Sequence, residues 1–504
     1  MTKRYILSID QGTTGSTCMA FDQEGAALAK ANHEVTQYFP DPGCVEHDPE
    51  EIWSVTLHAV VDAMREAGLG PKDVSAVGIT NQRETTVLWD KESGKAQGRA
   101  IVWQCRRSAD ICAEMKKTGQ ETIFHEKTGL LLDPYFSGTK LTWVMRHDPD
   151  RAARARAGEL AFGTVDSWLL HKLTGGKVHA TDVSNASRTL MFDIQRRQWD
   201  PELIDILGVS DFILPEVCES SHVFGYTDPD SFLGIEAPVA GIAGDQQAAL
   251  FGQACFRPGM TKNTYGTGSF VLMNIGEVPK LSQRGILTTI AWGLGGRTFY
   301  ALEGSIFVTG AAINWLRDGL GMIKNAVEIE PLALSVEDSE GVYFVPAFVG
   351  LGAPYWDPQA RALMLGMTRG TTRAHLARAV IESMAYQTAD VVQLMQQESG
   401  VNLKELRVDG GASVMDLLLQ IQADLLRVPV RRPVIAETTA LGAAMLAGLA
   451  MGIWASQEEL SARWKMDREA LPRANDAEMK KRYAIWKQAV EKSLGWADIL
   501  ATLD

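Results

Sequence analysis

The chain has 504 residues, of which 46% are hydrophobic and 22% are charged. This composition excludes a disordered, collagen-like or low-complexity protein, and the length predicts two domains that can hold a substrate cleft between them. The 49 Lys and Arg residues against 62 Asp and Glu residues give a net charge of −13, and the basic residues form no long block. Nucleic acid is therefore not an expected partner.

The six cysteines lie far apart, at positions 18, 44, 105, 112, 218 and 255. They form no CxxC pair and have no histidine at metal-ligand spacing, which favours reduced thiols in a cytoplasmic protein and argues against zinc. The apolar run before Asp10 is too short for a signal peptide. The longest uncharged stretch, 438–457, is dominated by Gly, Ala and Thr, and it predicts a buried helix rather than a membrane span.

The first elements in chain order are a hairpin, a helix and a strand. Residues 5–9 form a short apolar run ending in Asp10 and a Gly/Thr-rich turn, and residues 18–21 resume a strand pattern. Apolar residues recur at helical spacing over 52–64, and 74–79 is a further buried strand. Alternating strands and helices predict an α/β fold, in which the polar groups just past strand ends, Asp10, Arg83 and Glu84, mark a candidate site.

The second half of the chain repeats this opening scheme. The segments DQGTT at 10–14 and YGTGS at 265–269 look like equivalent hairpin tips of a duplicated architecture. We place the boundary near residue 250, which gives domains 1–250 and 251–504. Further predictions are a Gly-rich turn at 408–413 followed by a helix over 417–426, a helix over 439–450 at the domain junction, and a helical tail after Trp464.

Common catalytic motifs are missing from the chain. It contains no GxxxxGK[ST], GxGxxG, HExxH or GxSxG motif and no HRD or DFG set. Three Gly-rich turns, each after a buried strand and two of them led by Asp, can instead hold nucleoside phosphates through amide N–H groups and hydroxyls, while carboxylates hold Mg²⁺. For any one turn taken alone, an ordinary structural turn is the favoured interpretation.

Nine segments carry a family resemblance: DQGTTGS at 10–16, ITNQRETT at 79–86, IVWQCRRSA at 101–109, DPYFSGTKLTW at 133–143, GIAGDQQAALFGQ at 241–253, KNTYGTGSF at 262–270, VPAFVGLGAPYWDP at 345–358, LRVDGGA at 406–412 and TTALGAA at 438–444. In this order and spacing they closely resemble the FGGY family of carbohydrate kinases, and within it the members that phosphorylate glycerol. The resemblance implies two actin-like (ribonuclease H-like) domains with a catalytic cleft between them. It also implies ATP-dependent phosphorylation of glycerol to sn-glycerol 3-phosphate, with Mg²⁺ and ATP, in glycerol catabolism.

The resemblance assigns roles to individual residues. Asp245 is the expected general base, and Asp10 and Asp245 are the expected carboxylates on the Mg²⁺ side. The glycerol site is expected to contain Arg83, Glu84, Trp103, Tyr135, Asp245, Gln246 and Phe270. The nucleotide site is expected to contain Thr13, Thr14, Gly15, Thr17, Thr267, Gly310, Asn314, Gly411 and Met415.

Simpler structural roles stay open for several of these residues taken singly. Asp245 could be a helix N-cap and Asp10 a turn cap. Arg83 and Glu84 could form a surface ion pair that contributes little, and the aromatic residues at 103 and 270 could belong to the core.

The chain departs from the family pattern on the nucleotide side. Gly15-Ser16-Thr17 stands where members commonly carry Ser-Ser-Arg, Met415 where they often carry Asn, and Asn314 where they often carry Gln. Loss of a cation predicts weaker ATP and ADP binding and faster product release. In the segment 228–236, Glu236 replaces the Arg of relatives inhibited by fructose 1,6-bisphosphate, and no His is present for phosphohistidine activation. We expect insensitivity to both effectors.

Two other functions stay open at this point. One is a sister kinase that acts on another polyol or sugar, and the other is a non-catalytic actin-like module that only binds ATP. The expected partners are glycerol, ATP and further copies of the chain in a dimer or tetramer, with no nucleic acid and no membrane span.

Overall fold

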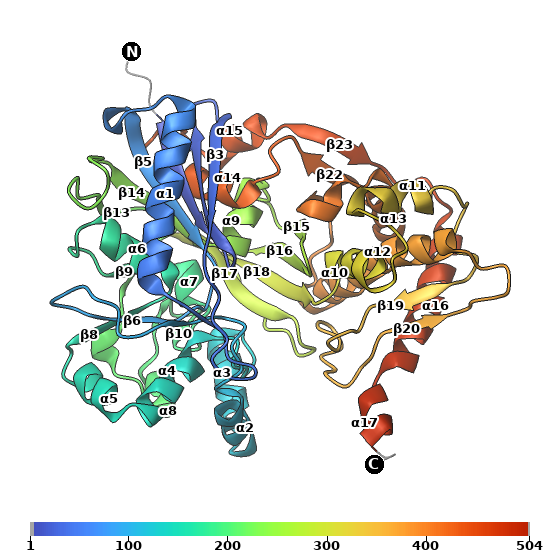
Figure 1. The fold of residues 1–504 in the computed structure, drawn as a ribbon, viewed down its shortest axis with the longest axis horizontal. Coiled ribbons are helices and arrows are strands. Elements are labelled where there is room, and N and C mark those ends of the chain that lie inside the picture. Colours follow the sequence, from blue (N-terminus) through green and yellow to red (C-terminus); the bar gives the residue numbers. More distant parts are fainter. Residues whose placement is uncertain (1–4, 502–504) are drawn as a thin grey trace.

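The computed structural model describes residues 5–501, and two mixed β-sheets form the centres of its two lobes (Figure 1). The first sheet has the strand order β13-β14-β5-β1-β2-β3. Its strands are β1 (Tyr5–Gln11), β2 (Gly15–Phe21), β3 (Ala27–Glu34), β5 (Val74–Asn81), β13 (Ser221–Tyr226) and β14 (Pro238–Gly244).

The second sheet has the order β17-β18-β16-β15-β21-β22-β23. Its strands are β15 (Met260–Tyr265), β16 (Ser269–Gly276), β17 (Leu287–Leu294), β18 (Arg297–Ile306), β21 (Glu405–Asp409), β22 (Val430–Pro433) and β23 (Met466–Ala470).

The two sheets repeat one plan, which confirms the duplicated architecture. The antiparallel hairpin β1–β2 corresponds to β15–β16, and each hairpin has an antiparallel neighbour on one side, β3 or β18. On the other side the first hairpin strand pairs in parallel with β5 or β21, which in turn pairs in parallel with β14 or β22. Both Gly/Thr tips therefore lie at corresponding edges of their sheets.

Helices cover the sheets. In the first lobe α1 (Pro49–Ala67) packs on β2 and β3, and in the second lobe α12 (Arg373–Ser399) packs against α13 (Asp416–Leu426). Helix α1 begins where the Asp48 carboxylate accepts a hydrogen bond from the N–H of Glu50 at 2.9 Å, and it ends at Gly68, whose φ of 68° suits a residue without a side chain.

The other helices are α2 (Ala109–Lys117), α3 (Glu121–Thr128), α4 (Ser137–His147), α5 (Pro149–Arg156), α6 (Val165–Leu173), α7 (Val183–Ala186), α8 (Pro201–Leu207), α9 (Asp245–Gly252), α10 (Gly310–Asn314), α11 (Ile329–Ala333), α14 (Thr438–Ala450), α15 (Gln457–Arg463), α16 (Asp476–Ser493) and α17 (Trp496–Ala501). Short strands complete the fold: β4 (Glu46–His47), β6 (Val87–Asp90), β7 (Ala100–Ile101), β8 (Leu160–Gly163), β9 (Ala180–Asp182), β10 (Phe192–Asp193), β11 (Gln198–Trp199), β12 (Glu216–Cys218), β19 (Tyr343–Val345) and β20 (Leu363–Leu365).

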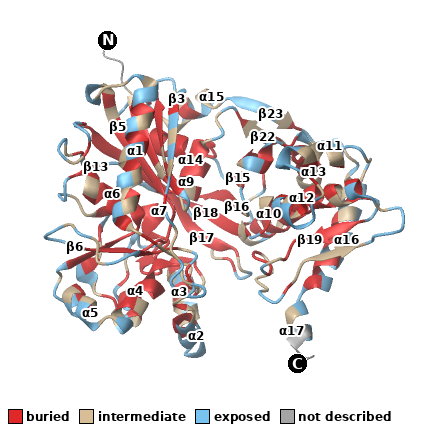
Figure 2. Ribbon diagram, in the orientation of Figure 1, coloured by how far each residue is buried: buried red, intermediate tan, exposed pale blue. Residues whose placement is uncertain are grey.

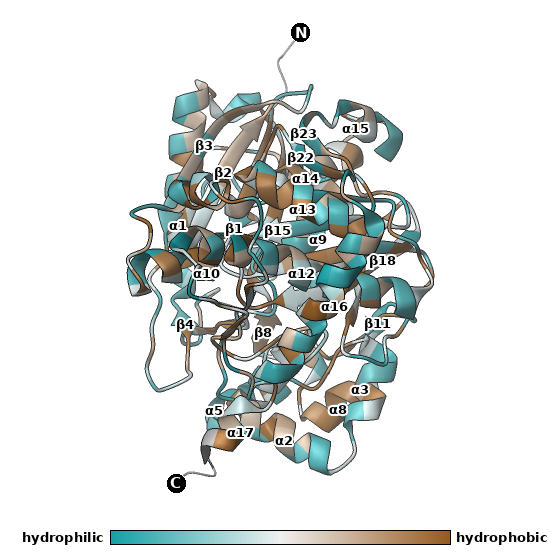
Figure 3. Cartoon of the chain, turned by 90° about the vertical axis from the view of Figure 1, so that its right-hand side faces the viewer, coloured by the Kyte–Doolittle hydropathy of each residue, from teal (hydrophilic) through white to brown (hydrophobic). Residues whose placement is uncertain are grey.

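Helix α14 lies at the junction of the two lobes, where it packs on α9 and on strands β5, β14 and β1 (Figures 1 and 2). The Ser8 hydroxyl donates to the carbonyl oxygen of Ala440 at 2.7 Å. The helix consists mostly of Ala, Gly, Leu and Thr and is largely hydrophobic (Figure 3), so the neighbouring backbone can approach it closely. One core cluster around it contains residues of both sheets, including Ile6, Ala240 and Leu272.

Most sequence expectations for the elements are confirmed. The hairpin, the strand at 74–79 and the helices at 52–64, 417–426 and 439–450 are present, each within a few residues of the expected bounds. The expectation of an entirely helical tail after Trp464 is wrong, because β23 pairs with β22 as the edge of the second sheet. Along the described part of the chain, no helix is long and apolar enough to cross a membrane.

Candidate active site between the lobes

The parallel pairing of β1, β5 and β14 brings three expected site residues to one edge of the first sheet. Asp10 on β1 pairs with Thr80 of β5, and Asn81 at the end of β5 pairs with Gly244 of β14. Arg83 follows β5 by two residues, and Asp245 follows β14 as the first residue of α9. Their shared position is the loop edge where α/β sheets bind ligands.

Arg83 is the centre of the polar cluster at this edge. Its guanidinium is buried, with 2% exposure, and its Nε lies 3.1 Å from Oδ1 of Asp245. Its Nη2 donates to Oε1 of Glu303 at 3.0 Å and to the hydroxyl of Tyr135 at 3.4 Å, and its Nη1 donates to Gln247 at 3.2 Å. The surface-pair interpretation of Arg83 is therefore wrong, because a buried guanidinium holds residues of both lobes.

Glu84 is also buried, and its backbone adopts a φ of 61°, which is unusual for a residue other than glycine. Its carbonyl oxygen accepts hydrogen bonds from the hydroxyl of Ser137 at 3.0 Å and from Nζ of Lys140 at 3.3 Å. Burial raises the pKa of the Glu84 carboxyl, and the nearby Arg83 and Arg188 oppose this rise. Strained backbone held by its surroundings in this way is typical of functional sites.

Two charged residues that complete the cluster, Arg188 and Glu303, were missed by the sequence analysis. Nε of Arg188 donates to Oε1 of Glu84 at 2.7 Å, and its Nη2 donates to Oε1 of Glu303 at 2.9 Å. Burial disfavours ionisation of Glu303, but the guanidiniums of Arg188 and Arg83 outweigh it and lower the pKa of Glu303 to about 2. Neither residue belongs to a recognisable motif. Arg188 follows α7 in the first lobe, and Glu303 reaches Arg83 from β18 of the second lobe.

Aromatic side chains border the polar cluster around Arg83. The rings of Trp103 and Tyr135 meet edge to face with centroids 5.5 Å apart, and the Arg83 guanidinium lies 6.0 Å from the ring centre of Phe270. The indole N–H of Trp103 donates to the hydroxyl of Thr13 at 2.9 Å. Trp103, Tyr135 and Phe270 are only partly buried, so each keeps surface available to a ligand.

Asp245 differs from the other acids of the cluster because 30% of its side chain is exposed. Its Oδ1 accepts a hydrogen bond from the N–H of Gln246 at 2.7 Å, so it also serves the helix start, while Gly244 is the N-cap residue. The Gln246 side chain accepts a hydrogen bond from Nζ of the buried Lys262, whose other partner is Thr264 at 3.0 Å. Burial lowers the pKa of Lys262 to about 8, although the carboxylates of Asp409 and Asp245 oppose this. Lys262 was also missed by the sequence analysis.

Asp10 lies in an environment that suits a cation. Burial and the negative charges of Asp245 and Glu437 raise the pKa of Asp10 to about 8, against a smaller opposing effect of Lys30. A divalent cation would balance these carboxylates, and oxygen ligands are those that Mg²⁺ prefers. Within residues 5–501, no group of three or more His, Cys, Asp or Glu side chains is arranged to hold a metal ion. A cation at Asp10 would therefore need further oxygen ligands, from water or from a bound substrate.

Comparisons with known proteins agree with this geometry. The N-terminal domain of the FGGY family of carbohydrate kinases matches residues 5–252, and the C-terminal domain of that family matches residues 261–451. The chain belongs to the FGGY family. Its relatives include glycerol kinase 2 of Thermotoga maritima, 57% identical over 98% of this chain and 99% of the relative, and the glycerol kinase of Caldanaerobacter subterraneus, 55% identical over the same shares.

A solved structure shows the same fold. The crystal structure of Plasmodium falciparum glycerol kinase with ADP matches this FGGY chain with a TM-score of 0.92 and 34% identity, over 98% of both chains. The expected family and its two-domain actin-like fold are thereby confirmed. The boundary near residue 250 and the roles of the individual site residues stay predictions.

The second lobe of this FGGY protein contains a cavity of about 420 Å³ near the β15–β16 tip. Five residues expected at the nucleotide line it together: Thr267, Gly310, Asn314, Gly411 and Met415. Apolar side chains, among them Ile313, Val327 and Val414, form much of the remaining wall. An apolar cavity with a few polar groups suits a nucleobase and its sugar.

The start of α10 is fixed to the hairpin tip beside this cavity. The N–H of Gly310 donates to the carbonyl oxygen of Gly266 at 3.0 Å, and the Thr309 hydroxyl donates to the same oxygen at 3.1 Å. A Cβ atom on Gly310 would lie 2.6 Å from that oxygen, so the close approach requires glycine.

The remaining four residues expected at the nucleotide belong to the other hairpin. Thr13 and Thr14 form the β1–β2 tip, and Gly15 and Thr17 lie on β2. Thr17 accepts a hydrogen bond from Asn32 at 2.9 Å and pairs with Asp10 across the hairpin. None of the four lines the cavity in the second lobe. Thr13 instead contacts the aromatic side of the Arg83 cluster through the indole N–H of Trp103.

Proposed function

We propose that this FGGY kinase transfers the terminal phosphate of ATP to glycerol and releases sn-glycerol 3-phosphate and ADP. The observation that carries the proposal is the Arg83 cluster, in which cationic, hydroxyl and carboxylate groups meet aromatic walls at the edge of the first sheet. Relatives that are 54–57% identical over nearly the whole chain and bear the name glycerol kinase support the same conclusion.

In this proposal Asp245 accepts the proton of the hydroxyl that is phosphorylated. Its carboxylate keeps exposed surface, and the ion pair with Arg83 holds its orientation. General-base catalysis needs a carboxylate held in this way within reach of the reacting hydroxyl. Arg83, Glu84, Tyr135 and Gln246 are proposed to bind the hydroxyls of glycerol, and Trp103 and Phe270 to contact its carbon edge.

The nucleotide is proposed to place its base and sugar against Thr267, Gly310, Asn314, Gly411 and Met415, with its phosphates toward Thr13, Thr14, Gly15 and Thr17. Mg²⁺, bound on the side of Asp10 and Asp245, would supply charge neutralisation to the phosphates. Thr17 and Met415 offer neither a cation nor an amide, so weaker nucleotide binding than in family members with Arg and Asn stays a prediction.

Several broader statements also belong to this proposal. A cytoplasmic location is supported by six cysteines that are all free thiols. We further propose a homo-oligomer, and insensitivity to fructose 1,6-bisphosphate and to histidine phosphorylation. Both insensitivities are predicted from the loop 228–236, in which Phe232 is fully buried in the core and Glu236 is exposed.

The test is ADP release followed with a coupled assay, in the presence of glycerol, of other polyols, triose and pentulose sugars, and with no acceptor. We expect the highest kcat/KM with glycerol and little ADP without acceptor. Preference for another acceptor would assign a sister kinase. ATP binding by calorimetry without ADP release on any acceptor would assign a non-catalytic module.

A further inference from the structure

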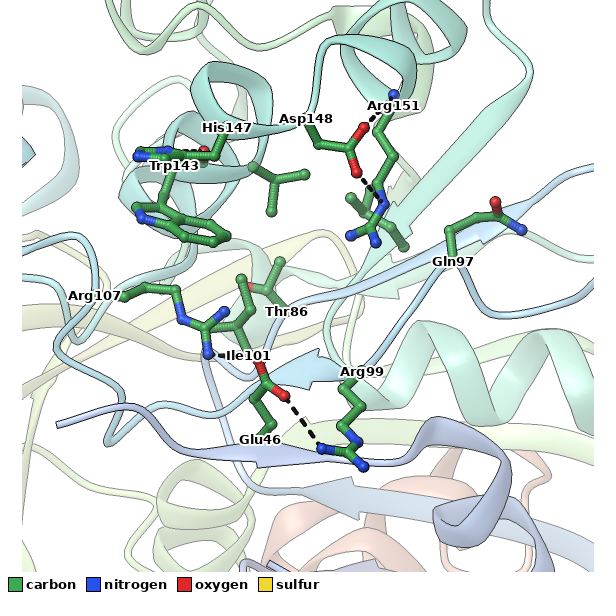
Figure 4. A pocket seen from close by; sticks show the side chains of 12 residues that line it. Glu46, Thr86, Gln97, Arg99, Ile101, Arg107, Trp143, His147, Asp148 and Arg151 are labelled. Carbon is green, nitrogen blue, oxygen red and sulfur yellow. Dashed lines mark hydrogen bonds and ion pairs between the residues drawn. The ribbon is translucent and has the colours of Figure 1, made fainter. Parts of the chain in front are cut away.

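A second cavity, of about 330 Å³, lies in the first lobe (Figure 4). Strands β6 and β7 form one side through Leu88 and Ile101, and helices α4 and α5 form the other side through Trp143 and Arg151. No residue expected to bind glycerol or ATP lines this cavity.

Charged groups from separate elements surround the cavity. Arg107 is partly buried, with a side chain that is 9% exposed. Its Nη2 lies 2.6 Å from Glu46, and its guanidinium lies 4.8 Å from the ring centre of Trp143. Arg151, with 34% exposure, holds Asp148 through its Nε at 2.9 Å, and its terminal amino groups point toward the middle of the cavity (Figure 4). Arg99 contacts Glu46 from the other side at 3.7 Å.

The charges that line the cavity do not cancel. Three guanidiniums face two carboxylates, those of Glu46 and Asp148, so these five side chains carry one net positive charge. This occurs in a chain whose net charge is −13. A cavity that concentrates guanidiniums on an acidic protein attracts a small anion, because guanidinium forks bind oxyanions with two parallel hydrogen bonds.

The shape of the cavity narrows the class of anion. Its volume is at the lower end of ligand sites, so it suits a small metabolite. Leu88, Ile101 and Val144 offer apolar surface beside the cations, which suits a short carbon skeleton. Arg107 and Arg151 approach from opposite sides (Figure 4), and a phosphate group has three free oxygens to share between two forks, one more than a carboxylate.

Two short paths of contacts join the cavity to the proposed glycerol site. Thr86, which lines the cavity, exchanges backbone hydrogen bonds with Ile101 at 2.9 and 3.0 Å, and its hydroxyl donates to the carbonyl oxygen of Glu84 at 3.2 Å. Helix α4 has Trp143 near its cavity end, and at its other end Ser137 donates to the same carbonyl oxygen. Both paths end on the strained residue Glu84.

We propose that this cavity is a second binding site, for a small phosphate monoester, and that its occupation changes the affinity of the polyol site through Glu84. The binding itself is independent of the proposed function. The effect on glycerol rests on that function. A ligand that favours one arrangement of Glu84 changes glycerol affinity, and linkage requires that glycerol changes the affinity for that ligand by the same factor.

The binding is tested by calorimetry on the full chain saturated with glycerol and Mg²⁺-ADP, so that the catalytic site is filled. The probes are 3-phosphoglycerate, inorganic phosphate and malonate. We expect saturable binding of 3-phosphoglycerate, weaker binding of phosphate and malonate, and a loss of about tenfold or more in R151A, because a charge-assisted contact is removed. R146A is the matched control, since Arg146 is on the same helix as Trp143 but exposed and paired with Glu114.

Any of three results would overturn the site. The first is no binding heat with 3-phosphoglycerate up to about 10 mM, which corresponds to negligible affinity. The others are equal 3-phosphoglycerate affinity in R151A and wild type, or a loss of that affinity in R146A as large as in R151A. Malonate binding as tightly as 3-phosphoglycerate would overturn the phosphate assignment. R151E, which reverses the charge without adding bulk to the core, repeats the test if R151A is poorly folded.

The coupling is tested by glycerol titrations with and without saturating 3-phosphoglycerate. We expect the glycerol Kd to change by about twofold or more in wild type and not in R151A, and the 3-phosphoglycerate Kd to change by the same factor with glycerol. Binding of 3-phosphoglycerate with an unchanged glycerol Kd would overturn the coupling alone. Failure of the proposed function would instead show as no glycerol binding at all.

Discussion

Asp245 joins two properties that a catalytic base needs, an orientation fixed by Arg83 and a side chain that is 30% exposed. We predict that Asp245→Asn keeps the shape of the site and lowers kcat by about 10²–10⁴-fold, the usual effect of losing a general base. Glycerol binding should weaken much less than turnover. Single-turnover kinetics measure this, with Asp41→Asn on an exposed turn as control. Near-normal kcat in Asp245→Asn would contradict the assignment.

Glu303 orients Arg83 from the second lobe, and it also binds Arg188. Glu303→Gln preserves the side-chain shape and removes the charge that both guanidiniums contact. We predict that the glycerol KM rises by about tenfold, the range for one charge-assisted hydrogen bond, while the ATP KM changes little. Glu340→Gln, an exposed acid in the second lobe, is the control. Equal rises in both KM values would indicate general disorder of the site instead.

Lys262 gives the site a pH dependence. Because burial lowers its pKa to about 8, its positive charge is present at pH 7 and is lost as the pH rises through about 8. We predict that kcat/KM falls along this alkaline limb in wild type, and that Lys262→Met has lower activity at pH 7 and lacks the limb. Lys324→Met on the surface should keep it. An unchanged limb in Lys262→Met would assign the titration to another group.

The charged residues of the site show which roles can be predicted from the sequence and which cannot. Arg83, Glu84 and Asp245 could be named because they follow strand ends inside recognisable segments. Lys262 and Glu303 lie inside strands of the second lobe, and Arg188 follows a short helix. Lys262 begins the segment 262–270, whose pattern alone does not give its role, and Arg188 and Glu303 lie outside all nine segments. Their role depends on contacts that span as many as 220 residues of chain, as between Arg83 and Glu303.

At the scale of elements, the contact between α14 and β5 depends on glycine. A Cβ atom on Gly78 would lie 2.4 Å from the carbonyl oxygen of Ala443, so a backbone shift is needed to accept it. We predict that Gly78→Ala lowers the free energy of unfolding by about 1–3 kcal/mol, the usual cost of overpacking.

Thermal and denaturant unfolding measure this change. Gly370→Ala is the control, because its nearest neighbour would be a threonine hydroxyl at 3.7 Å and its φ is not positive. It should change stability by no more than about 0.5 kcal/mol. Equal stability of Gly78→Ala and wild type would mean that α14 shifts without cost.

Elements were easier to predict than their partners. Periodicity located the hairpins and helices, because each is encoded by neighbouring residues. The small residues of 439–450 predicted close packing at the junction, and α14 does pack there. Strand β23 was not predicted, because its sequence MDREA is mostly charged and only its pairing with β22 makes it a strand.

For the molecule as a whole, one helix from the second half of the chain packs on the sheet of the first half. Helix α14 comes near residue 440, yet it packs on strands β1, β5 and β14 of the first sheet. In one core cluster, Leu446 of α14 lies together with residues of both sheets, such as Phe21 on β2 and Leu272 on β16. If the chain is divided near residue 250, α14 falls in the second part. The first sheet is then separated from the helix that covers one of its hydrophobic faces.

This arrangement predicts how the two halves depend on each other. A fragment of residues 1–252 would expose the face of β5 and β14 that α14 covers, and exposed apolar faces of this kind lead to aggregation. We predict that the fragment is insoluble or lacks a cooperative unfolding transition. In the full chain both lobes should unfold in the same calorimetric transition, because they share the core cluster around α14.

Joining residues 1–252 to 436–464 through a flexible linker restores α14 and α15 and serves as the matched control. This joined chain should be more soluble than the fragment alone, because the helix returns to the exposed face. A fragment 1–252 that is monomeric and unfolds cooperatively would contradict the prediction. It would show that the first lobe folds on its own and that α14 docks on a finished surface.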